Sequence, residues 1–262
     1  MHFYQQTDNG VEPRHYVPMS TRPNELRPSR MSDLRAAAKR GEAWVPSVTT
    51  ILNVLDKPAL GNWKVDQHLQ QAWKIAQQAD PFGESIDNWI AEVKRLTELH
   101  MDIAPSAGTD VHKVLEEYAA GALKIGHPQF ELCQNVFAKI ADETGLTTAD
   151  FRSEVNFVHE AGFGGMADLV SDNWIFDLKS KQFAEKFKPK KMVYPEHYMQ
   201  LSAYREGLTP PGIIRRRHRC ANIFVCLENG AIDLHEHSAE DLERGYQLFK
   251  HCLAIWQLQN GA

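Results

Sequence analysis

The sequence has no C-x-x-C pair, because its four cysteines, at positions 133, 220, 226 and 252, lie far apart. This spacing excludes zinc ribbons and thiol-redox motifs of that type, and we expect buried, reduced thiols. No stretch approaches the roughly 18 consecutive apolar residues that a membrane span requires. The first ten residues also lack the basic start and apolar run of a secretory signal. We therefore expect a soluble, cytoplasmic protein with no membrane partner.

Basic residues are in deficit as well, since 29 Lys and Arg stand against 34 Asp and Glu, and the formal net charge is -5. This balance argues weakly against a nucleic-acid binder. The positive charge is nevertheless clustered. Residues 14–40 hold seven basic side chains against two acidic ones, and we expect residues 1–45 to form a basic N-terminal arm, either a DNA contact or a solvated, partly disordered leader. Two further clusters lie at 179–191 and 215–219.

Apolar periodicity predicts helices in the first half of the chain and strands alternating with helices in the second. Helical spacing indicates helices at about 63–76, 85–96, 109–120, 130–141, 195–207 and from 239 onward. Period-two alternation indicates strands at 152–160, 164–171, 173–180, 220–227 and 231–235. We expect an α/β fold in which residues 46–262 form one domain, with a helical lobe at 46–150 and an α/β core at 151–262 whose mixed sheet is flanked by helices. The aromatic residues of the lobe are spaced as expected for core packing: Trp63, Trp73, Phe82 and Trp89.

One strand carries an unusual pair of charges. Alternation over 173–180 places Asp177 and Lys179 on the same face of an otherwise apolar strand, where burying a charge is costly unless it is paired or bound to a metal. Asp168 lies on the preceding strand, and two adjacent strands can bring both carboxylates to one divalent cation. Glu154, one strand earlier, could add a third carboxylate or position a water. The alternative is an edge strand with a solvated ion pair.

Several motifs around these residues resemble one nuclease family. Asp168 followed by Asp177-x-Lys179 resembles the PD-(D/E)xK phosphodiesterase core, with Asp in place of the commoner Glu. Gly108-Thr109-Asp110-Val111-His112 resembles the G-x-x-x-H helix of RecB-type exonucleases, and Gln200-Leu201-Ser202-Ala203-Tyr204 resembles their Q-x-x-x-Y helix. Residues 46–63 resemble the N-terminal segment of phage-type members and of the mitochondrial genome maintenance exonucleases. The motifs occur in the family's order and span residues 46–204.

The resemblance implies a metal-dependent DNA exonuclease that leaves 5′-phosphate and 3′-hydroxyl ends. It implies that Mg²⁺ or Mn²⁺ is held by His112, Asp168, Asp177 and the carbonyl of Leu178. The implied catalytic residues are Lys179, Asp177, Asp168, Glu154, Gln200 and Tyr204. Lys179 would orient the nucleophile, while the amide and phenol of Gln200 and Tyr204 would hold a metal-bound water, Lys179 or a phosphate. The cysteine spacing departs from that of the iron–sulfur members of the family, so we expect no cluster.

DNA that is single-stranded or has a free end is the expected substrate. The residues expected to contact it are Ser47, Thr49, Lys181, Lys188, Lys190, Lys191, Arg215, Arg216 and Arg217. The resemblance suggests recombination, repair or phage genome processing, in the host cytoplasm if the protein is phage-encoded, with a recombination or single-strand-binding protein as partner. Two alternatives stay open: a structure-specific or flap endonuclease with the same site, and a DNA-binding accessory protein without turnover. The presence of all four of His112, Asp168, Asp177 and Lys179 disfavours the accessory protein.

Overall fold

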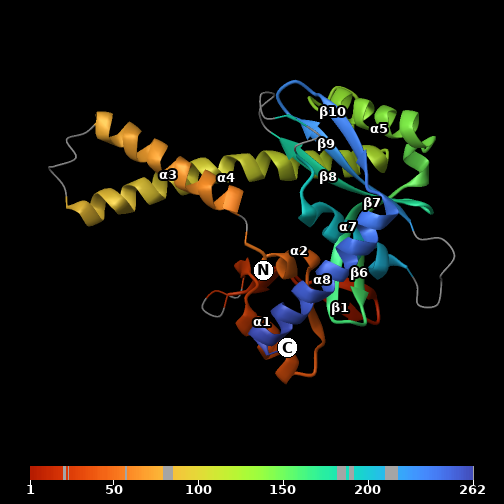
Figure 1. The fold of residues 1–262 in the computed structure, drawn as a ribbon, viewed down its shortest axis with the longest axis horizontal. Helices are drawn as coiled ribbons and strands as arrows, with labels where there is room; N and C mark the ends of the chain where they lie inside the picture. The colour runs from red at the N-terminus through yellow and green to blue at the C-terminus, as the bar shows by residue number, and fades with distance from the viewer. Residues whose placement is uncertain are drawn as a thin grey trace. The chain divides into compact units, whose positions relative to one another are not determined.

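The computed structural model describes residues 1–262 except for 20, 21, 23, 57, 79–84, 182–186, 189–191, 210–217 and 262, and it describes only the backbone of 58–60 and 100–110. The chain has two compact units (Figure 1). Residues 1–54 and 112–262 form the first unit, and residues 55–111 form the second. The expected division at residues 45 and 150 therefore differs from the one observed.

A five-stranded mixed sheet is the centre of the first unit. Its strand order is β10-β9-β8-β7-β6, and the strands are β6 (Arg152–His159), β7 (Phe163–Val170), β8 (Trp174–Lys181), β9 (Arg219–Cys226) and β10 (Ile232–Glu236). Neighbouring strands are antiparallel except β8 and β9, which are parallel. A parallel pair requires a crossover connection, and helix α7 (Pro195–Leu208) lies in it. The expected α/β class with a mixed sheet is confirmed.

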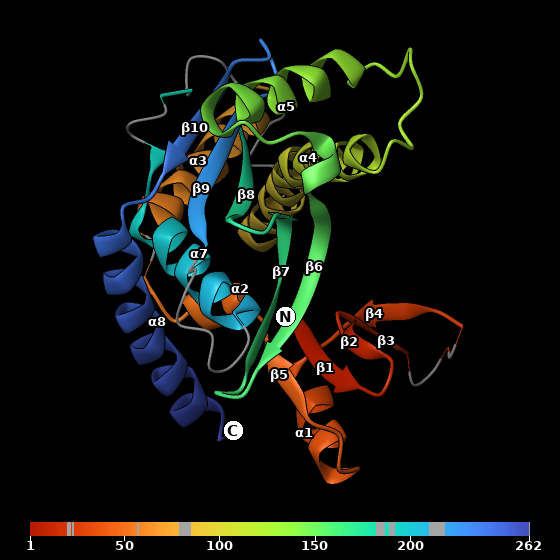
Figure 2. The same ribbon diagram turned by 90° about the vertical axis from the view of Figure 1, so that its right-hand side faces the viewer.

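Helices cover both faces of this sheet (Figure 2). Helix α7 packs against β6, β7, β8 and β9, and α8 (Ala239–Asn260) packs on α7. On the other face, aromatic contacts link α5 (Phe130–Thr144) to β8. The ring of Phe137 on α5 contacts Phe151, and Phe151 contacts Phe176 on β8. Strand β8 is the middle strand of the five and both of its faces are covered, so the alternative of a solvated edge strand does not hold.

Short strands occupy the segment that we expected to be an arm. Strands β1 (Phe3–Thr7), β2 (Gly10–Pro13) and β5 (Trp44–Pro46) form one sheet, and β3 (Tyr16–Pro18) pairs with β4 (Leu26–Pro28). Helix α1 (Met31–Lys39) precedes β5, and α2 (Val48–Leu52) follows it. Strand β1 packs against β6 and β7, and the side chain of Phe3 is fully buried. Residues 1–45 are thus a folded part of the first unit and not an extended arm.

The basic side chains of this segment are largely paired with acidic ones. Arg27 contacts Asp33 at 2.7 Å, and Arg22 contacts Glu25. Two acidic partners lie just outside the window 14–40: Glu12 pairs with Arg14 and Glu42 pairs with Arg40. The excess of positive charge that the sequence indicated is therefore partly compensated by nearby acidic side chains.

The second unit is helical in the part that the structure describes. It contains α3 (Pro58–Gln78) and the first part of α4 (Ile86–Ala119), a single helix where we expected two. Trp63 and Trp73 have 37% and 67% of their surfaces exposed, so the expectation of core packing is wrong for both, while Phe82 lies outside the described residues. None of the helices in the described ranges is both long and apolar enough to cross a bilayer.

The contact between α7 and α8 leads to a stability prediction for Gly245. A Cβ at this position would lie 2.8 Å from the carbonyl oxygen of Tyr198, a backbone atom that cannot easily move. We expect Gly245→Ala to lower the free energy of unfolding by about 1–2 kcal/mol, because overpacking outweighs the gain in helix propensity. Gly61→Ala is the matched control, since nothing lies within 4 Å of its added methyl group. Urea denaturation checks both, and a Gly245→Ala protein as stable as the wild type would contradict the prediction.

Candidate active site

The candidate site lies where strands β7 and β8 meet. Leu169 pairs with Phe176 in the ladder, and the next residues along the two strands are Asp168 and Asp177. At this point the carboxylate of Asp168 accepts a hydrogen bond of 2.7 Å from the backbone N–H of Leu178. Burial raises the pKa of Asp177, and the negative charge of Asp168 adds to the rise while Lys179 opposes it. The fold therefore brings the two acidic residues of the sequence motif close together.

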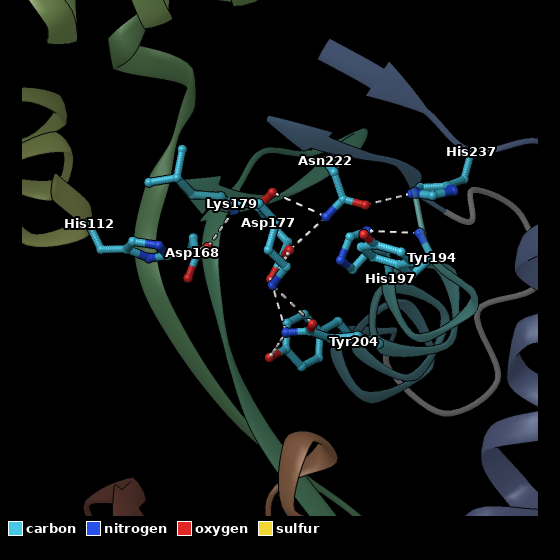
Figure 3. Close-up of polar contacts among 11 residues, drawn as sticks. His112, Asp168, Asp177, Lys179, Tyr194, His197, Tyr204, Asn222 and His237 are labelled. Carbon is cyan, nitrogen blue, oxygen red and sulfur yellow. Dashed lines mark hydrogen bonds and ion pairs between the residues drawn. The ribbon is translucent and has the colours of Figure 1, made fainter. Parts of the chain in front are cut away.

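The carboxylate of Asp177 is held by three side-chain donors (Figure 3). Only 3% of Asp177 is exposed. Lys179 Nζ lies 2.8 Å from Oδ2, Gln200 Nε2 donates to Oδ1 at 2.9 Å, and Asn222 Nδ2 donates to Oδ2 at 2.6 Å. Lys179 also contacts Oδ1 at 3.1 Å. Donors from β8 itself, from α7 and from β9 thus fix a single buried carboxylate.

Gln200 links this carboxylate to Lys179 and Tyr204. Its Oε1 accepts a hydrogen bond of 3.2 Å from Lys179 Nζ, and its Nε2 donates to the hydroxyl of Tyr204 at 2.8 Å. Burial alone would lower the pKa of Lys179, but the charge and hydrogen bond of Asp177 outweigh burial and leave that pKa raised. Lys179 therefore remains a cation at neutral pH, with its direction set by two acceptors.

His112 approaches the same oxygen of Asp168 that accepts the Leu178 N–H. Its Nδ1 is 3.6 Å from Asp168 Oδ2. Burial acts to lower the pKa of His112, but hydrogen bonding and charge attraction from Asp168 outweigh it and raise the pKa above its usual value. Helix α4 thus places the His112 imidazole next to the Asp168 carboxylate of β7.

A pocket lined by apolar and acidic side chains continues from this point. Its polar lining is formed by His112, Glu116, Glu154 and Asp168. Glu154 has a left-handed backbone, with φ 49°, between the ladder pairs Ser153–Leu169 and Val155–Ala167 that place it opposite Asp168. Such a backbone costs a non-glycine residue about 1–2 kcal/mol. Burial raises the pKa of Glu154, and the charges of Glu116 and Asp168 add to this rise while His112 opposes it.

The residues expected to contact DNA differ in how exposed they are. Ser47 is 3% exposed, and its hydroxyl accepts the Thr50 N–H at 3.0 Å to cap α2, so it is not available at the surface. Thr49 and Lys188 are exposed, and Lys181 is partly exposed. The remaining expected contacts lie outside the described residues: Lys190, Lys191, Arg215, Arg216 and Arg217.

Three residues of the site were missed in the sequence. Glu116 follows His112 by one helical turn and lines the same pocket. Asn222 is fully buried and pairs with Asp177 in the β8–β9 register, and His237 Nε2 lies 2.7 Å from its Oδ1. Asn222 could have been found, because it is a lone amide in the apolar stretch 220–226, as Asp177 is a lone acid in its own strand.

The side chains suit a divalent cation in type. Within the described ranges, no group of three or more His, Cys, Asp or Glu side chains is placed to hold a metal ion. Mg²⁺ does not require one, since it keeps several waters and is usually bound by one or two carboxylates. Asp168 and Asp177 supply that number of hard oxygen donors.

His237 provides a stability prediction that depends on pH. Burial, followed by the positive charge of His235, lowers the pKa of His237 to about 4, although Asp241 acts in the opposite direction. In the unfolded chain a histidine titrates near pH 6.5. Each unit of difference between the folded and the unfolded pKa changes the free energy of unfolding by up to about 1.4 kcal/mol. Between about pH 6.5 and 4 the unfolded chain therefore binds a proton that the folded chain does not, and the free energy of unfolding falls as the pH falls.

The variant His237→Gln is expected to show a smaller fall in the free energy of unfolding as the pH falls, because it has no titrating group at this position. Urea denaturation at pH 7 and pH 5 measures the effect. His15 and His197 also have lowered pKa values and contribute to the same slope, so we expect only part of it to disappear. Identical slopes for the variant and the wild type would contradict the prediction.

Comparison with known proteins gives a limited result. No family model matches the chain, and no curated protein matches it. Among crystal structures, a protein from Eubacterium rectale proposed to be an exonuclease is similar at 13% identity and a TM-score of 0.41, over 59% of this chain and 68% of that one. An alkaline exonuclease from Laribacter hongkongensis is similar at 15% identity and a TM-score of 0.35, over 58% of this chain and 81% of that one. Similarity at this level assigns no activity to the chain.

Proposed function

We propose that the protein is a metal-dependent DNA nuclease of the PD-(D/E)xK type, of the RecB-like branch, that acts from a free DNA end. The observation that carries the proposal is the convergence of Asp168, Asp177 and Lys179 on one point of the sheet, with Gln200 from α7 contacting two of them. Burying this many polar groups is costly. A catalytic site explains why an apolar strand carries them at its centre.

The side chains have distinct roles in this proposal. A bound Mg²⁺ or Mn²⁺ would be held first by Asp168 and Asp177, with His112 and the Leu178 carbonyl as the further ligands that the resemblance implies. It would lower the pKa of a water and neutralise phosphate oxygens. Lys179 supplies a permanent positive charge beside the scissile phosphate. Gln200 keeps the Lys179 ammonium directed toward Asp177, and Tyr204 accepts the second N–H of Gln200, which fixes the amide. Glu154 remains a candidate for positioning the water.

Positive charge near the site is consistent with a DNA substrate. Lys181 and Lys188 follow Lys179 along the chain and are at least partly exposed. Contacts of this kind with the phosphate backbone do not depend on base sequence. We place the activity in recombination, repair or phage genome processing, as the motif resemblance implies, and a recombination or single-strand-binding protein is the proposed protein partner.

Labelled DNA of several forms tests the proposal. Linear single- and double-stranded DNA, labelled at the 5′ or the 3′ end, is incubated with Mg²⁺, Mn²⁺ or a chelator, next to a circular single strand. We expect cleavage of linear DNA only with metal, and an intact circle. Cleavage of the circle would favour the flap or structure-specific endonuclease. No metal-dependent cleavage by the folded protein would leave the DNA-binding accessory protein as the better explanation.

A further inference from the structure

Two buried amides hold the Asp177 carboxylate from different sides. Gln200 on α7 donates to Oδ1 at 2.9 Å, and Asn222 on β9 donates to Oδ2 at 2.6 Å. Both amides are at least nine-tenths buried, with 8% and 0% of the residue exposed. The third donor, Lys179, is more exposed, with 29% of its side chain accessible to solvent. The direction of the carboxylate is therefore set by the two amides, and Lys179 adapts to it.

Each amide is itself fixed by one further side chain. The hydroxyl of Tyr204 accepts one N–H of Gln200 at 2.8 Å. On the other side, His237 Nε2 lies 2.7 Å from Asn222 Oδ1. Because Oδ1 is an acceptor, His237 must carry its proton on Nε2 and donate it. The Asn222 amide then cannot rotate by half a turn without placing its oxygen against the carboxylate of Asp177.

We propose that Asn222 and His237 are positioning residues for the active site, and that His237 orients the Asn222 amide so that Asn222 holds Asp177 in the direction needed for catalysis and cation binding. This inference rests on the proposed nuclease function, because it concerns the same carboxylate. In the part of the chain that the structure describes, neither side chain forms a hydrogen bond with the Lys179 ammonium, so both act through Asp177. Outer hydrogen-bond partners of this kind commonly change metal affinity or activity by about 10- to 100-fold.

Substitution of His237 gives the sharper test, because its side chain is linked to Asp177 through Asn222. His237→Phe keeps an aromatic ring but removes the donor, whereas His237→Gln retains an N–H that can reach Asn222 Oδ1. We expect His237→Phe to lower kcat by about 10-fold or more and to weaken Mn²⁺ binding by a similar factor, with the KM for DNA unchanged. We expect His237→Gln to recover most of both losses.

The matched control is His251→Phe, because His235 is itself the cross-strand partner of Asn222 and its ring contacts that of His237. His251 makes the same chemical change possible at an exposed position on α8. We expect this variant to keep wild-type kcat and Mn²⁺ affinity. Asn222→Asp provides a second approach, since it replaces the donor by an acceptor of the same shape beside Asp177 and should weaken kcat and Mn²⁺ binding at least as much as His237→Phe.

Steady-state kinetics, calorimetric titration with Mn²⁺ and thermal unfolding are measured on all four variants. Unchanged kcat and Mn²⁺ affinity in folded His237→Phe would overturn the inference. So would losses that follow the melting temperature and are not recovered in His237→Gln, because they would reflect stability alone. If the wild type binds Mn²⁺ but cleaves no DNA, the proposed function fails, and the Mn²⁺ titrations still decide the positioning role.

Discussion

The Asp177→Asn protein is expected to remain folded and to lose DNA cleavage by at least about 10³-fold. The substitution keeps the shape of the side chain but removes its charge and half of its accepting capacity. Three donors converge on this carboxylate, and an amide has only one oxygen to accept from them. We therefore also expect a loss of roughly 1–3 kcal/mol in the free energy of unfolding.

Asp172→Asn is the control for this variant. It makes the same chemical change five residues earlier, in an exposed turn before β8. We expect wild-type cleavage and stability. Cleavage rates are compared on end-labelled DNA with Mg²⁺ at equal concentrations of folded protein. A rate for Asp177→Asn within a few-fold of the wild type would remove Asp177 from the proposed site.

The Lys179→Met protein is expected to be inactive and clearly less stable. Removing one partner of a buried ion pair leaves the other charge uncompensated, which costs about 3–5 kcal/mol in fully buried pairs. Because 29% of the Lys179 side chain is exposed, we expect a smaller loss, of about 2–3 kcal/mol. The deficit should shrink as the pH falls, since the raised pKa of Asp177 allows this carboxyl to take up a proton and become neutral.

A double variant separates stability from catalysis. In Asp177→Asn/Lys179→Met neither charge remains, so the protein should recover much of the stability that Lys179→Met loses while cleavage stays absent. Urea denaturation of the wild type, both single variants and the double variant forms a double-mutant cycle. Additive losses in stability would show that the two side chains do not depend on each other.

The sheet and its helices were largely predictable from the sequence. The strands β6 to β10 and the helices α5, α7 and α8 agree with their expected ranges to within a few residues, because strong period-two or helical patterns mark them. The N-terminal segment was not predictable in this way. Its strands have three to five residues, too short for a pattern, and they form because β1 packs against β6 and β7, far away in the sequence.

The candidate site shows the same division. The charges of Asp177 and Lys179 were visible in the sequence, because they interrupt an apolar strand. The contribution of His237 was not, because it depends on two strand pairings: β10 with β9, which brings His237 to Asn222, and β9 with β8, which brings Asn222 to Asp177. Expected contacts such as Ser47 failed for a related reason, since its hydroxyl is used to cap a helix.

The most direct measurement is a time course of cleavage of end-labelled linear DNA by the wild type and by Asp177→Asn, with Mg²⁺ and with chelator, in which the released products are identified. The proposed nuclease function predicts that the wild type cleaves the DNA with Mg²⁺ and not with chelator, and the motif resemblance implies products with 5′-phosphate and 3′-hydroxyl ends. Equal cleavage by Asp177→Asn, or cleavage by the wild type that persists in the chelator, would contradict the proposed function.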